Sequence, residues 1–138
     1  MKMKLILCGI AASLMFVQPT MADEDSPLAK QMEAMNDAYK AMRRETDTAK
    51  GAALAREAQD AIAKVVTEIP ELVKAMPEGP EKAKASAEFR KMMGGLISTL
   101  ADMELAFLNN DLDKVKEIVD AMREMKKKGH EKFMEEDE

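Results

Sequence analysis

The chain has 138 residues, of which 46% are hydrophobic, and its 26 acidic and 21 basic side chains give a net charge of −5. This length suits one domain with a single hydrophobic core. The acidic balance argues against nucleic acid or an anionic membrane as the main partner.

The first 22 residues have the features of a secretory signal peptide. Lys2 and Lys4 precede the mostly apolar run 5–17, and Thr20 and Ala22 are small residues at the −3 and −1 positions of a cleavage site. The run is too short for a permanent transmembrane helix. Lipidation at Cys8 is the less favoured alternative, because no small residues precede that cysteine.

Cleavage after residue 22 predicts a mature exported domain, residues 23–138, without a membrane anchor. Loss of the two leader lysines would make its net charge −7, and it would contain no cysteine. The missing cysteine excludes thiol catalysis, cysteine-ligated zinc and covalent attachment of a c-type haem, which requires C-x-x-C-H. We expect the mature protein to be a monomer.

Two helices are predicted in the first half of the mature chain. The first begins at Ser26-Pro27, a cap residue followed by a proline at the first helical position. The second spans residues 49–68 and ends before Pro70, which cannot continue a helix. Residues 69–80, with three prolines, form the longest predicted connection.

Two further helices are predicted over residues 81–109 and 111–134, separated by a turn at Asn109–Asp111. Each of the four helices has one apolar face, and no alternating β pattern occurs in the sequence. The fold class is therefore all-α, an up-down-up-down antiparallel four-helix bundle. The four stripes are Leu28, Met32, Met35, Tyr39 and Met42; Leu54, Ala58, Ala61, Ile62 and Val65; Phe89, Met92, Met93, Leu96, Leu100, Met103 and Phe107; and Val115, Ile118, Val119, Met122, Met125 and Phe133.

In this topology the start of the first helix and the end of the last lie at the same end of the bundle. Met32 lies on the inner face there, and His130, the only histidine, lies at the rim of its stripe. A thioether and an imidazole on opposite sides can hold haem iron with both axial positions filled, which favours electron transfer over oxygen chemistry. The side chains expected to line the slot are Met35, Tyr39, Phe89 and Met93.

Three alternatives compete with this interpretation. The chain contains 14 methionines, so a structural or chaperone-like bundle could place one opposite His130 without any cofactor. Thioethers also suit Cu(I), with Met32/Met35, Met92/Met93 and Met122/Met125 as candidate pairs. An enzyme is disfavoured, because the sequence has one histidine, no glycine-rich phosphate loop and no repeated Glu-x-x-His motif.

Three short strings resemble the cytochrome b562 family: Met32 to Asp37, Phe89-Arg90, and His130 to Phe133. The resemblance implies a periplasmic electron-transfer protein with one non-covalent b-type haem, axial ligands Met32 and His130, and an unidentified redox protein as partner. It also implies two further cofactor-binding positions, Asn36 and Lys126, and assigns Met93 to the haem pocket as well. Met93 and Lys126 depart from the phenylalanine and arginine of the family pattern.

Overall fold

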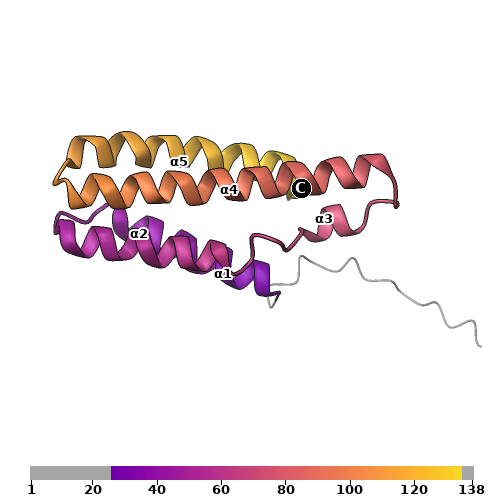
Figure 1. Cartoon of the computed structure of the whole chain (residues 1–138), viewed down its shortest axis with the longest axis horizontal. Helices are drawn as coiled ribbons and strands as arrows, with labels where there is room; N and C mark the ends of the chain where they lie inside the picture. The colour runs from indigo at the N-terminus through magenta and orange to yellow at the C-terminus, as the bar shows by residue number, and fades with distance from the viewer. Residues whose placement is uncertain (1–25, 135–138) are drawn as a thin grey trace, which may run out of the picture.

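A computed structural model describes residues 26–134 (Figure 1). All regular structure in this range is helical, so the all-α prediction is confirmed. The predicted signal peptide, residues 1–22, lies outside the described residues. The helices are α1 (Pro27–Met42), α2 (Thr48–Ala63), α3 (Glu71–Lys74), α4 (Pro80–Leu108) and α5 (Leu112–Phe133).

Three of the long helices begin at side-chain caps that the sequence indicates. The Ser26 hydroxyl accepts a hydrogen bond from the Ala29 N–H at 3.0 Å, and Pro27 occupies the first helical position. Asp47 and Asp111 accept hydrogen bonds from first-turn N–H groups of α2 and α5. Each cap satisfies a donor that has no partner within its own helix, and so defines where the helix begins.

Helix α2 ends at Ala63, so the predicted end at residue 68 was wrong. Beyond Ala63 the N–H of Val65 bonds to the Ile62 carbonyl at 3.0 Å, and the N–H of Glu68 bonds to the Val65 carbonyl at 3.0 Å, which are turn bonds. Residues 65–67 are Val-Val-Thr. These β-branched residues lose side-chain freedom in a helix, so the chain leaves the helix before it meets a proline.

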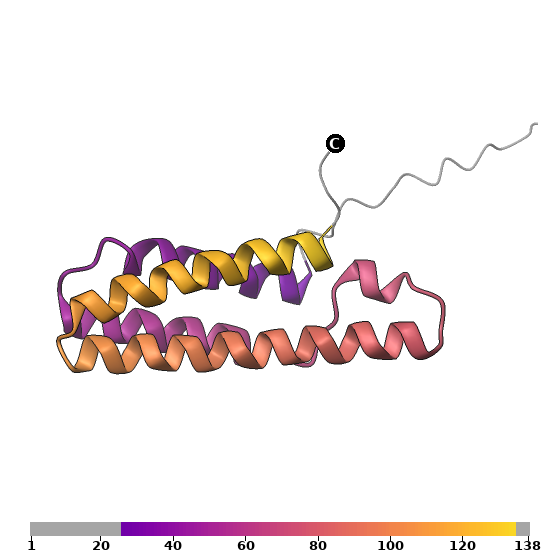
Figure 2. The same cartoon turned by 90° about the horizontal axis from the view of Figure 1, so that it is seen from above.

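The predicted connection 69–80 contains a fifth helix that the sequence analysis missed. The Pro70 carbonyl accepts hydrogen bonds from the N–H groups of Val73 and Lys74, both at 3.0 Å, and starts the single turn of α3. Val73 is only 2% exposed and belongs to the core. Helix α3 therefore lies against α4 and contributes Val73 to the core (Figure 2).

Consecutive long helices pack against each other, with close backbone contact between α1 and α2, α2 and α4, and α4 and α5. The α1–α2 and α4–α5 turns meet at one end, where the Thr48 hydroxyl donates to the Asn110 side-chain oxygen at 2.8 Å. No helix within residues 26–134 is long and apolar enough to cross a membrane. The largest side chains in the centre of the core are Phe107, Met42, Ile62, Met93, Leu100, Met103 and Val65.

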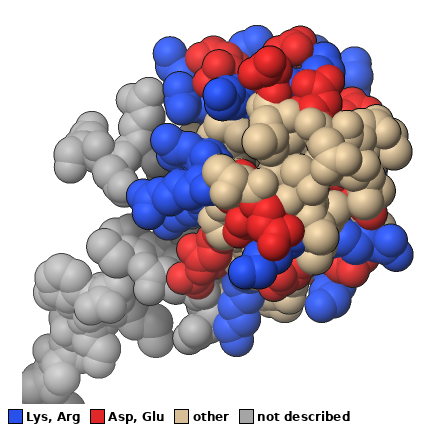
Figure 3. All heavy atoms as spheres, turned by 90° about the vertical axis from the view of Figure 1, so that its left-hand side faces the viewer, with Lys and Arg blue, Asp and Glu red and all other residues tan. Residues whose placement is uncertain are grey.

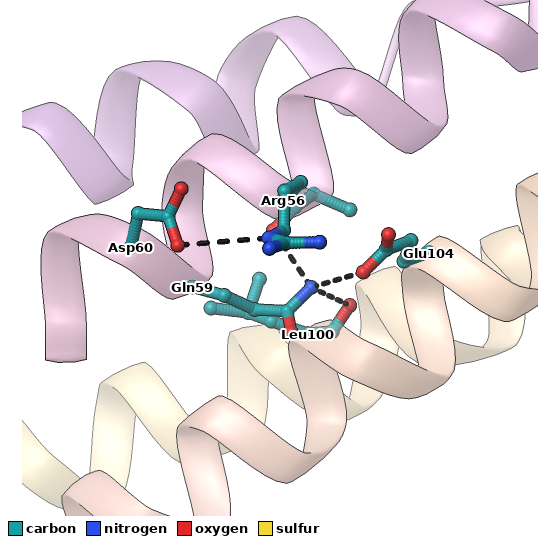
Figure 4. A network of polar contacts seen from close by, with 6 residues as sticks. Arg56, Gln59, Asp60, Leu100 and Glu104 are labelled. Carbon is teal, nitrogen blue, oxygen red and sulfur yellow. Dashed lines mark hydrogen bonds and ion pairs between the residues drawn. The ribbon is translucent and has the colours of Figure 1, made fainter.

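Gln59 joins α2 to α4 through its side-chain amide (Figure 4). The amide nitrogen donates to the Glu104 carboxylate at 2.7 Å and lies 3.2 Å from the Ala55 carbonyl and 3.5 Å from the Leu100 carbonyl. Gln59→Ala should lower the free energy of unfolding by about 1 kcal/mol, the usual net value of such a hydrogen bond. Chemical denaturation measures this loss.

The control for Gln59 is Arg56→Ala on the same helix. Within the described part of the chain, Arg56 makes a single ion pair, a solvent-exposed one with Asp60 at 3.6 Å. Its loss should change stability by less than about 0.5 kcal/mol. Equal losses in the two variants would show that the hydrogen bonds of the Gln59 amide across the α2–α4 interface do not contribute to the free energy of unfolding.

Candidate functional site

A hydrogen bond between α1 and α5 sets the register of these two helices. The Lys126 ammonium donates to the Asn36 side-chain oxygen at 3.1 Å. Met32 lies one helical turn before Asn36, and His130 lies one turn after Lys126. The helices are antiparallel here, because Tyr39, later in α1, bonds to Val119, earlier in α5. Met32 and His130 therefore lie at the same level on neighbouring helices.

The two side chains differ in exposure. Met32 is half-buried and packs against the core, whereas His130 is exposed. The buried residues around His130 on α5 are Gly129 and Phe133. Among residues 26–134 the His130 imidazole has no hydrogen-bond partner, and no group of three His, Cys, Asp or Glu residues could hold a metal ion. The donors offered at this level are one thioether and one imidazole.

The predicted lining residues form an apolar wall beside these donors. Met35, Tyr39, Phe89 and Met93 are all buried, and Met93 is completely inaccessible. The Phe89 ring meets the Phe133 ring edge to face, with centroids 5.2 Å apart. The apolar pattern predicts Phe133 only as a core residue and does not indicate its pairing with Phe89. Its position three residues after His130, on the same string, was the available signal.

Two predicted pocket residues have structural partners within the described chain. The Tyr39 hydroxyl donates to the Val119 carbonyl at 3.3 Å, and the Arg43 guanidinium lies 5.8 Å from the centre of the Tyr39 ring. Tyr39 thus closes the apolar wall on the side away from Met32. Lys126 is exposed, and its ammonium is engaged by Asn36. The bond between Lys126 and Asn36 joins α1 to α5. The backbones of these two helices pack less closely than those of the other neighbouring pairs.

An ion pair holds the last turn of α5 against α4. The Lys132 ammonium lies 2.8 Å from the Glu88 carboxylate. This hydrogen bond holds the pKa of Glu88 below its ordinary value of 4.5, against a smaller opposing effect of desolvation. Since the folded pKa is depressed, the pair stabilises the folded state above pH 4.5, and its contribution is lost as the pH falls through the folded pKa.

Removal of the Lys132 ammonium should raise the pKa of Glu88. We expect the NMR titration midpoint of the Glu88 carboxyl to move toward 4.5 in Lys132→Gln. Lys84→Gln removes a weaker charge interaction and should move the midpoint less. A midpoint that is the same in Lys132→Gln and the unmodified protein would contradict the pairing.

A family model described as cytochrome b562 matches residues 27–134, from the first residue of α1 to the residue after α5. The chain belongs to the cytochrome b562 family. Membership indicates a haem-binding electron-transfer cytochrome. Searches of curated proteins and of solved structures gave no significant match.

The residues of this cytochrome fit a haem at one end of the line along which α1 and α5 face each other, called the α1–α5 seam below. Met32 would supply a soft sulfur donor at this level, and His130 an imidazole that has no hydrogen-bond partner among residues 26–134. The buried side chains of Met35, Phe89 and Met93 supply an apolar surface next to them. Residues 26–134 contain no cysteine, so none of them could attach a haem covalently through a thiol.

Proposed function

We propose that this protein is a periplasmic electron-transfer protein that binds one b-type haem non-covalently, with Met32 and His130 as axial ligands. Its four long helices form an up-down-up-down antiparallel bundle around the haem after removal of residues 1–22. The observation that carries the proposal is the Asn36–Lys126 hydrogen bond, because it puts the two donors at one level. Family membership supports haem binding independently.

Each residue of the site has a chemical task in this proposal. A haem bound here would supply one-electron redox chemistry, and Met32 and His130 would hold its iron. The Met32 thioether would favour the reduced iron and so raise the potential. The buried Phe89 and Met93 exclude water from the redox centre, and exposed His130 lies at the solvent edge, where electrons can be exchanged.

The structure does not favour the Cu(I) alternative. Of the six candidate methionines, Met35, Met93 and Met122 are buried in the core. The remaining three lie half-buried on two different seams, Met32 on α1, and Met92 and Met125 where α4 meets α5. A soft-metal site needs several sulfurs that the metal can reach together, and the half-buried methionines offer at most two, Met92 and Met125, between the same pair of helices.

Reconstitution tests the proposal directly. Addition of haemin to the purified exported protein should produce a Soret band that saturates at one equivalent, and reduction should sharpen the visible bands of a low-spin iron. Visible absorption measures both the stoichiometry and the spin state. A Soret band that does not change as haemin is added would disprove haem binding, and saturation at two equivalents would disprove the single site.

A further inference from the structure

The α1–α5 seam has a second feature at the opposite end of the bundle from Met32 and His130. A groove of about 490 Å³ lies between the end of α1, the α1–α2 turn and the first half of α5. This volume falls in the range of small-molecule binding sites. Figure 3 faces this end and shows charged side chains around a continuous uncharged surface, with basic side chains gathered at its left border.

The floor of the groove is apolar. Met42, Val115 and Val119 line it and are only 1%, 5% and 8% exposed, so they belong to the hydrophobic core. Leu112 adds a half-buried side chain at the start of α5. A core that is open to solvent at its edge favours an alkyl or aromatic group, which covers the floor and releases water.

The rim of the groove carries an excess of positive charge. Four cations and two carboxylates line the groove. The Glu45 carboxylate keeps its charge and accepts hydrogen bonds from two backbone N–H groups of the α1–α2 turn. Asp120 pairs with Arg123 at 3.5 Å. The remaining three cations form no ion pair with any residue of 26–134, although the whole chain is acidic. They are Arg43, Arg44 and Lys116.

We propose that this groove binds an amphipathic carboxylate. Its apolar body lies on Met42, Val115 and Val119. Its carboxylate pairs with Arg44 and Lys116, whereas the Arg43 guanidinium already lies against the Tyr39 ring. Arginine suits this role, because its planar guanidinium can donate two parallel hydrogen bonds to a carboxylate. An apolar floor and a cationic rim are both needed for such a ligand, whereas a simple anion would use only the rim. The site is separate from the proposed haem site and does not depend on it.

Three probes separate the two requirements. Octanoate has both an alkyl body and a carboxylate, 1-octanol has only the body, and acetate has only the charge. In NMR titrations of the purified exported protein, octanoate below its micellar concentration should shift the methyl signals of Met42, Val115 and Val119 saturably. Octanol and acetate should bind at least about tenfold more weakly, since each lacks one of the two contributions.

Variants of exposed rim residues test the charges without disturbing the core. Arg44→Gln and Lys116→Gln should each weaken octanoate binding about fivefold, as expected for one solvent-exposed charge interaction. Lys127→Gln, an exposed position of α5 outside the groove, should leave the affinity unchanged.

Four results would overturn the proposal. Two concern octanoate: octanol binds as tightly as octanoate, or Lys127→Gln loses as much octanoate affinity as Arg44→Gln and Lys116→Gln. The other two are NMR shifts of the groove residues that appear when only the protein concentration is raised, and binding of a hexaglutamate peptide without binding of octanoate. The last two would identify the groove as a contact between two copies of the chain or as a docking site for an acidic protein segment.

Discussion

His130→Ala should abolish the low-spin haem spectrum and leave the helical structure intact. His130 is exposed and has no hydrogen-bond partner within residues 26–134, so its removal leaves neither a cavity nor an unpaired group. Haem affinity should fall by more than about 100-fold, beyond the loss usual for a residue that only orients a ligand. Absorption titration with haemin measures the affinity, and circular dichroism measures the helix content.

Met32→Ala should act differently because the imidazole remains. We expect haem to stay bound with its iron high-spin, and the reduction potential to fall, since the thioether no longer favours the reduced iron. The matched control is Met92→Ala, another half-buried methionine that lies against Gly129 on the α4–α5 seam. Equal effects of Met32→Ala and Met92→Ala, or a low-spin spectrum that survives His130→Ala, would contradict the assignment of the ligands.

The sequence predicts the long helices well where a repeating apolar face and a cap occur together. Ser26-Pro27 and Asp111 mark helix starts that the structure confirms. The end of α2 was missed because the apolar period continues to Val65, while the local preference of β-branched residues already favours a turn. Helix α3 is a single turn, too short for any periodicity, so Val73 could not be identified as a core residue.

The candidate site was predictable in part. Bundle topology places Met32 and His130 at the same end, and the family strings single them out from the other methionines. Their common level along the two helices follows from the bond between Asn36 and Lys126, which are 90 positions apart in the chain. The edge contact of Phe89 with Phe133 is likewise a tertiary contact. A one-dimensional pattern shows which face a residue occupies, but not which side chain it meets across an interface.

Gly51→Ala should destabilise the fold, although alanine is the better helix former. A Cβ atom at Gly51 would lie 2.3 Å from two carbons of the Phe107 ring, which is fully buried. The gain in helix propensity is about 1 kcal/mol. Overpacking a rigid, enclosed ring costs about 1–3 kcal/mol, and this contact is severe enough for the upper part of that range. We therefore expect the free energy of unfolding to fall by about 1–2 kcal/mol in chemical denaturation.

The chain contains a matched glycine at which the opposite sign is expected. Gly94 lies on the exposed face of α4, and a Cβ atom there would meet nothing within 4 Å. Gly94→Ala should therefore raise the free energy of unfolding by about 1 kcal/mol, because only the propensity effect remains. A smaller side chain at position 107 should also relieve the clash. The double variant, Gly51→Ala with Phe107→Leu, should therefore lose less free energy of unfolding than the sum of the losses in the two single variants. If Gly51→Ala stabilises the protein as Gly94→Ala does, the Phe107 ring can move aside, and the close approach of α2 to α4 does not depend on glycine.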